Sequence, residues 1–343
     1  DDIARKIVDV LEIKLLGKEQ TQLVKLYSES REAYSLYLKG RYYWNKREKD
    51  DNLKSIEYFQ EAVNKDPSYA LSYSSMGMAY ITLGTNLFFP SNEVFPRAKK
   101  AAKKALEIDP NLDEAHIVLA AELMWYEFDF IGAEKEFEKA MDLSPRNADA
   151  HHWHAFLSMF SGRTEEAIKE ILLARDLDPF APRKNTDVGQ IFFLSGDYPR
   201  AVEELKKSIE LFPEHSSNYV RIAEVYLQMG KYGDAIESIL PFAGQQDFVP
   251  TLAYAYALSG EKAKAQEILE NIIGNRGQKY FSAVQIARIY VGLGDKMQAF
   301  YWLGIAIAEA DIILAGLKVF PALDPLRSDL RFNELLRKVG LEK

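Results

Sequence analysis

The stretch SNYVRIAEVYLQMGKYGDAIESILPFAGQQD, residues 217–247, decides the fold of this chain. Its apolar positions recur three or four residues apart on both sides of Gly230, which predicts two short amphipathic helices joined by a turn. Gly230 can adopt a positive φ at little cost and can therefore end the first helix. Five residues later, Ala235 marks the point where the two helices approach closely, because a larger side chain there would overpack the contact.

The same pattern recurs along the chain at a nearly constant period. Residues equivalent to Ala235 are separated by 43, 35, 34, 34, 34, 30 and 34 residues, and they are Ser55, Ala98, Ala133, Ala167, Ala201, Ala235, Ala265 and Ala299. Glycines that hold the place of Gly230 are Gly84, Gly162, Gly196, Gly260 and Gly294. Prolines that would stop a second helix are Pro67, Pro110, Pro145, Pro179 and Pro213. A repeat of this length predicts helix pairs stacked into an elongated solenoid with an extended binding surface.

The order of residues in each unit resembles the tetratricopeptide repeat. Residues that match its first helix are Tyr73, Gly77 and Tyr80, and those that match its second are Ala133, Phe137, Ala140 and Pro145. The resemblance covers about residues 31 to 310, and it implies an all-α, right-handed solenoid of about eight helix pairs. Residues 1–30, with an apolar stripe from Ile3 to Leu15, and residues 311–343 are expected to form helical caps at the two ends.

Two units depart from the regular period. The longest spacing contains an apolar insertion with Leu87, Phe88, Phe89 and Phe95. These side chains could fold back over neighbouring helices, or they could form an exposed docking element for a partner. In the shortest unit, Pro241 predicts that the second helix ends early.

Several segments resemble a particular group of tetratricopeptide regions. These are residues 2–4, 37–44, 150–153 and 324–341. They are similar to the region at the C-terminal side of bacterial multidomain signalling proteins, behind a winged-helix, adenylate cyclase or protein kinase domain. This resemblance implies a sensory or scaffolding role for an output domain. Because the chain does not begin with methionine, we expect it to be a piece of a longer protein.

The composition disfavours several classes of ligand and chemistry. A formal net charge of −8 disfavours nucleic acid as a ligand, and the absence of cysteine excludes disulfides. No run of 18 apolar residues occurs, so we expect no membrane insertion. We predict a cytoplasmic location, or a periplasmic one if an upstream membrane segment has been removed. The oligomeric state does not follow from the sequence.

A partner-binding groove follows from the resemblance, because the first helices of tetratricopeptide repeats line the concave face. Carried over by register, the predicted groove residues are Tyr37, Arg41, Trp44, Met124, Trp125, His152, Phe156, Met159, Phe160, Gln190, Phe193 and Glu224. Aromatic residues and methionine are enriched in interface cores, so a protein or peptide ligand is expected there. The alternative for any of these rings is packing between helices.

No strong catalytic or metal-binding signature occurs in the chain. There is no HExxH, GxSxG or phosphate-binding glycine loop. His151 and His154 could share a helix face, but only His116 and Asp149 are obvious additions to a metal site, so we favour packing and hydrogen bonding. We therefore predict a non-catalytic interaction scaffold without cofactor or metal, part of a larger signalling protein. The alternative is a regulatory or substrate-recruiting region of a cyclase, kinase or transferase whose catalytic domain is absent from this chain.

Overall fold

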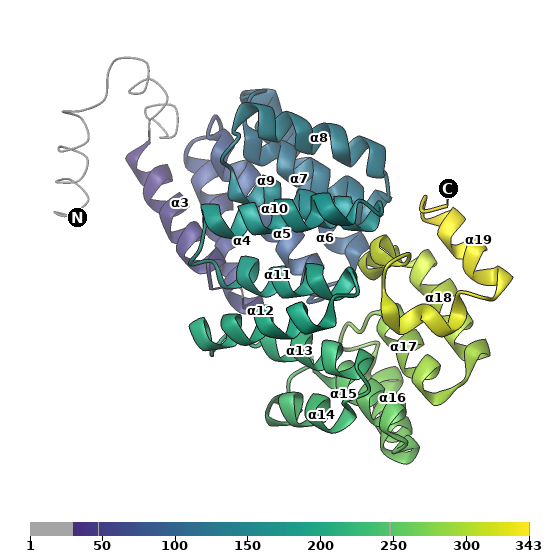
Figure 1. Cartoon of the computed structure of the whole chain (residues 1–343). Helices are drawn as coiled ribbons and strands as arrows, with labels where there is room; N and C mark the ends of the chain where they lie inside the picture. Colours follow the sequence, from purple (N-terminus) through teal and green to yellow (C-terminus); the bar gives the residue numbers. More distant parts are fainter. Residues whose placement is uncertain (1–29, 47, 247, 343) are drawn as a thin grey trace.

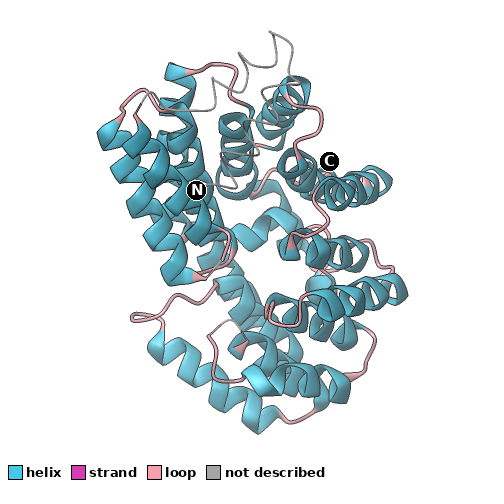
Figure 2. Cartoon of the chain, turned by 90° about the vertical axis from the view of Figure 1, so that its left-hand side faces the viewer, coloured by secondary structure: helices cyan, strands magenta, loops and turns pink. Residues whose placement is uncertain are grey.

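The computed structural model describes residues 30–46, 48–246 and 248–342, and every regular element in these ranges is a helix (Figure 1, Figure 2). Eight helix pairs follow one another: α3 (Arg31–Trp44) and α4 (Lys49–Lys65), α5 (Ala70–Thr85) and α6 (Ser91–Ile108), α7 (Asp113–Glu122) and α8 (Phe130–Leu143), α9 (Ala148–Phe160) and α10 (Thr164–Leu177), α11 (Pro182–Leu194) and α12 (Tyr198–Leu211), α13 (Ser217–Gln228) and α14 (Tyr232–Ile239), α15 (Val249–Ser259) and α16 (Lys262–Asn275), and α17 (Ala283–Leu293) and α18 (Lys296–Ala308). The predicted all-α solenoid of eight helix pairs is confirmed.

The repeated alanines lie where the two helices of a pair meet. All seven, and Ser55 at the eighth position, have no exposed surface. In the fifth pair, a Cβ added to Gly189 of α11 would lie 3.3 Å from the carbonyl oxygen of Ala201 and 2.5 Å from Leu205 Cγ. The small residues therefore let the two helices approach closely, and side-chain size decides these positions.

Glycines in the left-handed conformation end five of the first helices. Their φ angles lie between 72° and 90°, and they are Gly162, Gly196, Gly230, Gly260 and Gly294. The same prediction for Gly84 is wrong, because α5 continues to Thr85 and Leu87 takes the positive φ of 57°. Gly84 instead provides space inside the helix, since a Cβ there would lie 2.4 Å from Phe95 Cε2.

The first helices of successive pairs form the inner layer of the array. They contact one another from α3 through to α17, whereas consecutive second helices make far fewer contacts. A stack that is closer on one side curves toward that side, so the first helices line the concave surface. In the sixth pair α14 ends at Ile239 after eight residues, and the short 3₁₀ helix η2 (Leu240–Phe242) follows. The shortened second helix predicted around Pro241 is confirmed.

After α18 the chain folds back instead of continuing the array. It forms η3 (Ile312–Gly316), η4 (Pro321–Leu326) and α19 (Leu330–Lys338), and we call residues 311–342 the C-terminal segment. The element η4 packs on α17, α19 packs on α18, and η3 reaches the π-helix η1 (Leu123–Glu127) that follows α7. In Figure 1 the yellow trace of this segment leaves α18 and returns toward the middle of the array. Four of its leucines are completely buried: Leu314, Leu317, Leu323 and Leu326.

The expected N-terminal cap, residues 1–30, lies outside the described residues except for Ser30. Ser30 caps α3, because its Oγ accepts a hydrogen bond from the backbone nitrogen of Ala33 at 3.2 Å. Within the described ranges, no helix combines the length and the apolar character needed to cross a bilayer.

Candidate functional site

Three aromatic side chains form a cluster at the centre of the concave surface, which we call the aromatic seat: Trp125, Phe156 and Phe160. The ring centroids of Trp125 and Phe160 are 5.1 Å apart with their planes at 83°, and Phe156 lies 6.0 Å from both. Tilted and edge-to-face contacts of this kind are favourable for aromatic rings. Consecutive turns of α9 provide Phe156 and Phe160, and η1 provides Trp125.

The C-terminal segment lies over the aromatic seat. A Cβ added to Gly316 would lie 3.0 Å from Phe160 Cε1 and 2.4 Å from Phe320 Cε2. Ile312 and Ala315 belong to the same buried core as the seat, and Phe320 packs against that core. The exposed fractions are 8% for Trp125, 4% for Phe156 and 1% for Phe160. The centre of the concave surface is therefore filled by the chain itself.

A buried carboxyl group and an unusual turn shape η1 beneath the C-terminal segment. The Glu122 side chain at the end of α7 is completely buried and lies 3.2 Å from Lys99 Nζ. Burial raises the pKa of Glu122 to about 7, although the ammonium group of Lys99 acts in the opposite direction. Phe128 takes a positive φ of 56°, and a Cβ on Gly340 would lie 3.2 Å from its carbonyl oxygen. Single-turn π-helices often occur at functional sites, and this one presents Trp125.

The apolar insertion reaches the concave surface from the second pair. Its half-buried members pack against the array, and they are Leu87, Phe88 and Phe89. Asn86 Oδ1 accepts a hydrogen bond from Arg183 Nη1 of α11 at 2.9 Å. Arg183 Nε donates to Asp187 Oδ2 at 2.5 Å, and His152 Nε2 lies 2.8 Å from the same oxygen. The insertion therefore folds back, and polar contacts connect the second, fourth and fifth pairs.

The charge on Asp187 is stabilised within this polar network. The side chain is 1% exposed, and such burial alone would raise its pKa. The guanidinium group of Arg183 and the ring of His152 outweigh burial and hold the pKa of Asp187 well below its ordinary value. Burial lowers the pKa of His152 itself.

Most of the predicted groove residues are buried in this structure. The buried ones are Tyr37, Trp44, Met124, Trp125, His152, Phe156, Met159, Phe160, Gln190, Phe193 and Glu224. Arg41 alone among the predicted residues is half-exposed. Trp44 packs between helices, and its Nε1 donates a hydrogen bond to Thr82 Oγ1 of the next pair at 3.2 Å. The twelve residues therefore do not form one continuous open groove.

Arg41 lies toward the N-terminal end of the array, where it is held by aromatic groups. Its Nη1 donates to the Tyr37 hydroxyl at 3.1 Å, and the guanidinium carbon lies 5.4 Å from the centroid of the Trp44 ring. Burial and the neighbouring carboxyl of Asp113 raise the pKa of Glu114 to about 8, and Arg41 opposes this shift. The structure thus places a half-exposed cation near a carboxyl group that is easily protonated.

Glu224 joins the sixth pair to the eighth. Its Oε1 accepts a hydrogen bond from Arg288 Nη1 of α17, and its Oε2 accepts one from Arg221 Nη1, each at 2.9 Å. Burial alone would raise the pKa of Glu224, but the two guanidinium groups lower it. Both carboxylate oxygens are therefore engaged in contacts within the array.

The histidines are paired with carboxylates rather than gathered around one point. His116 Nδ1 lies 2.6 Å from Glu136 Oε2, and His151 Nδ1 lies 2.5 Å from Glu170 Oε2. His154 Nε2 lies 2.9 Å from Glu134 Oε1. Across the described residues there is no group of three or more metal-ligating side chains that could hold an ion. The interpretation of His151 and His154 as hydrogen-bonding residues agrees with these contacts.

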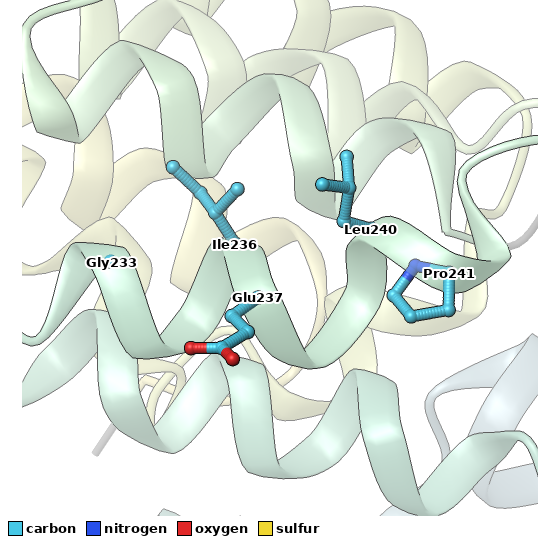
Figure 3. Close-up of a pocket in the computed structure, with 5 residues that line it drawn as sticks. All are labelled: Gly233, Ile236, Glu237, Leu240 and Pro241. Atoms are coloured by element: carbon cyan, nitrogen blue, oxygen red, sulfur yellow. The ribbon is translucent and has the colours of Figure 1, made fainter.

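An open hollow lies on the outer side of α14, where that helix is short. It is lined by Gly233, Ile236, Glu237, Leu240 and Pro241. Figure 3 shows Ile236 and Leu240 projecting from one side of the helix and Glu237 from another. Leu240 is 52% exposed, so the hollow is apolar and shallow.

Sequence reasoning missed two contributors to the concave surface. One is the C-terminal segment, whose apolar run from Ile312 to Leu317 is a signal of burial without indicating where. The other is the contact between Asn86 and Arg183, which are 97 residues apart and carry no shared motif.

Comparisons with known proteins agree with this architecture. A model of the tetratricopeptide repeat matches residues 216–240. The transcriptional regulator HilA of Salmonella typhimurium is 25% identical over 144 residues, which are 42% of this chain and 26% of HilA. The type IV pilus assembly protein PilF of Pseudomonas aeruginosa is 29% identical over 156 residues, which are 45% of this chain and 61% of PilF. The chain thus spans only about a quarter of HilA.

A solved structure shares the fold over a longer stretch. Human IFIT1 superimposes with a TM-score of 0.55 at 14% identity, covering 77% of this chain and 70% of the IFIT1 chain. At this level of identity the likeness concerns the fold alone. With the repeat match in the sixth pair, the eight stacked helix pairs and the recurring alanines give the chain the fold of a tetratricopeptide repeat solenoid.

Proposed function

We propose that this chain is a non-catalytic protein-interaction scaffold whose concave surface binds an apolar protein segment at the aromatic seat. The observation that carries the proposal is the occupant already there, because residues 312–320 of the same chain pack on the seat. An aromatic surface that holds an apolar segment in cis has the chemistry to hold a similar segment of a partner. Binding of the partner would then compete with the C-terminal segment.

The occupant indicates what kind of partner segment would fit. It presents Ile312 and Ala315 to the buried core, and Gly316 stands against Phe160 where a side chain would clash. A partner segment would therefore be short and apolar, with a small residue opposite Phe160. The net charge of −8 further favours a protein over nucleic acid.

We place the scaffold in a larger signalling protein, as its sensory or regulatory part. The similarity to HilA, a transcriptional regulator by name, supports this context, as does the resemblance of the chain to tetratricopeptide regions of bacterial signalling proteins. The proposed location is the cytoplasm.

The experiment that tests this proposal displaces the C-terminal segment from the seat by a substitution and adds the same segment as a separate peptide. In the variant Gly316→Leu, the new side chain collides with Phe160 and Phe320, so the C-terminal segment cannot seat. A labelled peptide of residues 309–327 should bind this variant, measured by fluorescence anisotropy. The parent chain should bind the peptide at least ~10-fold more weakly. Only those parent molecules whose C-terminal segment has left the seat can bind the peptide.

Two control variants separate the seat from general effects. Gly274→Leu changes a glycine with open space around it, so this protein should bind the peptide as weakly as the parent. Trp125→Ala, added to Gly316→Leu, removes an aromatic anchor and should weaken peptide binding about thirtyfold. If the Gly316→Leu protein keeps its helical circular dichroism spectrum and binds no peptide, the seat is not a segment-binding site.

A further inference from the structure

The outer face of α18 differs from that of every other second helix in the array. Two residues after the repeated alanine or serine, the other seven helices carry an exposed charge, at Glu57, Lys100, Lys135, Lys169, Glu203, Glu237 and Glu267. In α18 this position is Tyr301, which is 61% exposed. The outer surface of a terminal repeat is expected to be polar because it faces water. Because Tyr301 is an exception to this rule, we expect another molecule to pack on the outer face of α18.

No charged residue occurs in α18 between Lys296 and the end of the helix at Ala308. Besides Tyr301, its exposed outer positions are Met297, Gly304 and Ala308, and Met297 is 72% exposed. A Cβ on Gly304 would meet no atom within 4 Å. A helix that is apolar on all sides is normally buried on all sides. Here the helices between residues 30 and 342 that the structure describes cover only part of α18.

The described residues cover α18 from two directions and leave the third side exposed. One side packs on α17, and α19 contacts the N-terminal half, where the guanidinium carbon of Arg331 lies 4.0 Å from the centroid of the Phe300 ring. Leu330, at the start of α19, is 79% exposed beside this region. In Figure 1 α18 and α19 lie at the edge of the array.

We propose that this face is a homodimer interface, in which α18 packs antiparallel on α18 of a second copy of this chain. The face is self-complementary about a point between Tyr301 and Gly304. In a twofold antiparallel crossing centred there, the large side chain of Tyr301 meets Gly304 of the other copy, and Met297 meets the small Ala308. Lys296, at the N-terminal end of one helix, approaches Glu309, at the C-terminal end of the other. A twofold axis produces each of these contacts twice.

The charges also favour the antiparallel arrangement over a parallel one. Antiparallel helices bring the positive end of each helix dipole near the negative end of the other. Lys296 places a positive charge at one end of the face and Glu309 a negative charge at the other, where Glu309 also pairs with Arg276, the residue that follows α16. In a parallel dimer like charges would meet, and the outer face offers no residue to neutralise them.

The test measures the oligomeric state of the whole 343-residue chain. Sedimentation velocity across a concentration series should show a reversible dimer. Tyr301→Glu should weaken dimerisation about thirtyfold or more, because it removes a central aromatic residue and places two like charges in the interface. The substitution gives α18 the kind of residue that seven other helices carry at this position, so the fold should be unaffected. Glu267→Lys, at the matching position of α16, should leave the dimer intact.

A cross-linking experiment checks the arrangement itself. The chain has no cysteine, so Gly304→Cys introduces a single thiol. Under mild oxidation it should form a disulfide-linked dimer far faster than Glu237→Cys, which places a thiol on the outer face of α14. A parent chain that is monomeric throughout the series would overturn the proposal, and so would a dimer that Tyr301→Glu leaves unchanged. Exclusive binding of an unrelated partner to this face would also overturn it.

Discussion

The fourth pair and the last pair contain helices that are apolar on most sides, and the chain treats them differently. In α9 every residue from Ala150 to Phe160 is buried, whereas α18 leaves Met297 and Tyr301 exposed. The reason is position in the array: α9 lies between the third and fifth pairs, whereas among the described residues no further pair packs on the outer side of α18. An apolar helix thus indicates that something packs on it, and in the part of the chain that the structure describes this packing is complete around α9 and incomplete around α18.

The centre should depend on its aromatic packing more than any exposed ring does. Phe160→Ala removes a ring that is 1% exposed and contacts both Trp125 and Phe156. The free energy of unfolding should fall by about 3–5 kcal/mol, measured by urea denaturation. Phe180→Ala removes a ring that is 86% exposed and should change stability by less than about 0.5 kcal/mol. Equal losses in the two variants would mean that the seat is loosely packed.

Close packing inside a pair should matter in the same way along the whole array. Ala201→Leu adds bulk where α11 and α12 approach, and it should lower the free energy of unfolding by about 1–3 kcal/mol. Ala263→Leu places the same side chain on an exposed position of α16 and serves as the control. A melting temperature that is unchanged by Ala201→Leu would contradict the close contact that the structure shows.

The hydrogen bond between the insertion and the fifth pair should contribute less to the stability of the fold. Asn86→Ala removes the acceptor of the hydrogen bond from Arg183, which should cost about 1 kcal/mol in chemical denaturation. Asn92→Ala, at an exposed position of α6, should have no measurable effect. If the two variants are equally stable, the insertion is held by its apolar residues alone.

The weakest expected effect is a pH dependence of stability that comes from the contact between His151 and Glu170 in the fourth helix pair. The hydrogen bond to Glu170 raises the pKa of His151, so this pair stabilises the fold fully below the ordinary histidine pKa of about 6.5. That contribution is lost as the pH rises through the raised pKa. Burial opposes the charge on Glu170, but His151 lowers its pKa, so the contribution of Glu170 is lost only under acidic conditions.

The measurement compares the parent chain with His151→Asn, whose amide can donate to Glu170 without titrating. Between about pH 6 and pH 9, the free energy of unfolding of the parent should fall relative to that of the variant, by less than about 1 kcal/mol. The difference between the two proteins cancels the titration of groups that both share. A difference that grows in favour of the parent with rising pH would show that His151 is neutral in the fold.

The repeat was predictable because its signals are local. The small residue at the contact recurs in all eight units, and in five of them a glycine lies five residues before it. A proline that stops the second helix follows in five units. Gly84 shows the limit of such signals, since glycine is used both for a positive φ and for space beside a ring such as Phe95. The sequence pattern does not distinguish these two uses.

The concave surface was less predictable than the fold for a related reason. Helical register can assign Phe156 and Phe160 to one face of α9, but it contains no information about which distant segment covers that face. The cover comes from Gly316 and its neighbours, whose contacts are formed between residues far apart in the chain. Tyr37 and Trp44 illustrate the same point, because the sequence does not distinguish an aromatic residue that packs between helices from one that binds a partner.

The fold-back of the C-terminal segment also has a consequence for the time course of synthesis. Repeat arrays can fold progressively, since each unit contacts only its neighbours. Here Phe160 leaves the ribosome 156 residues before Gly316, its partner at the seat. At translation rates of roughly 5–20 residues per second, the aromatic side chains wait about 8–30 s for their cover. The nascent chain therefore passes through a stage in which the middle of the array is folded while its most aromatic surface is still open to chaperones and to other nascent chains.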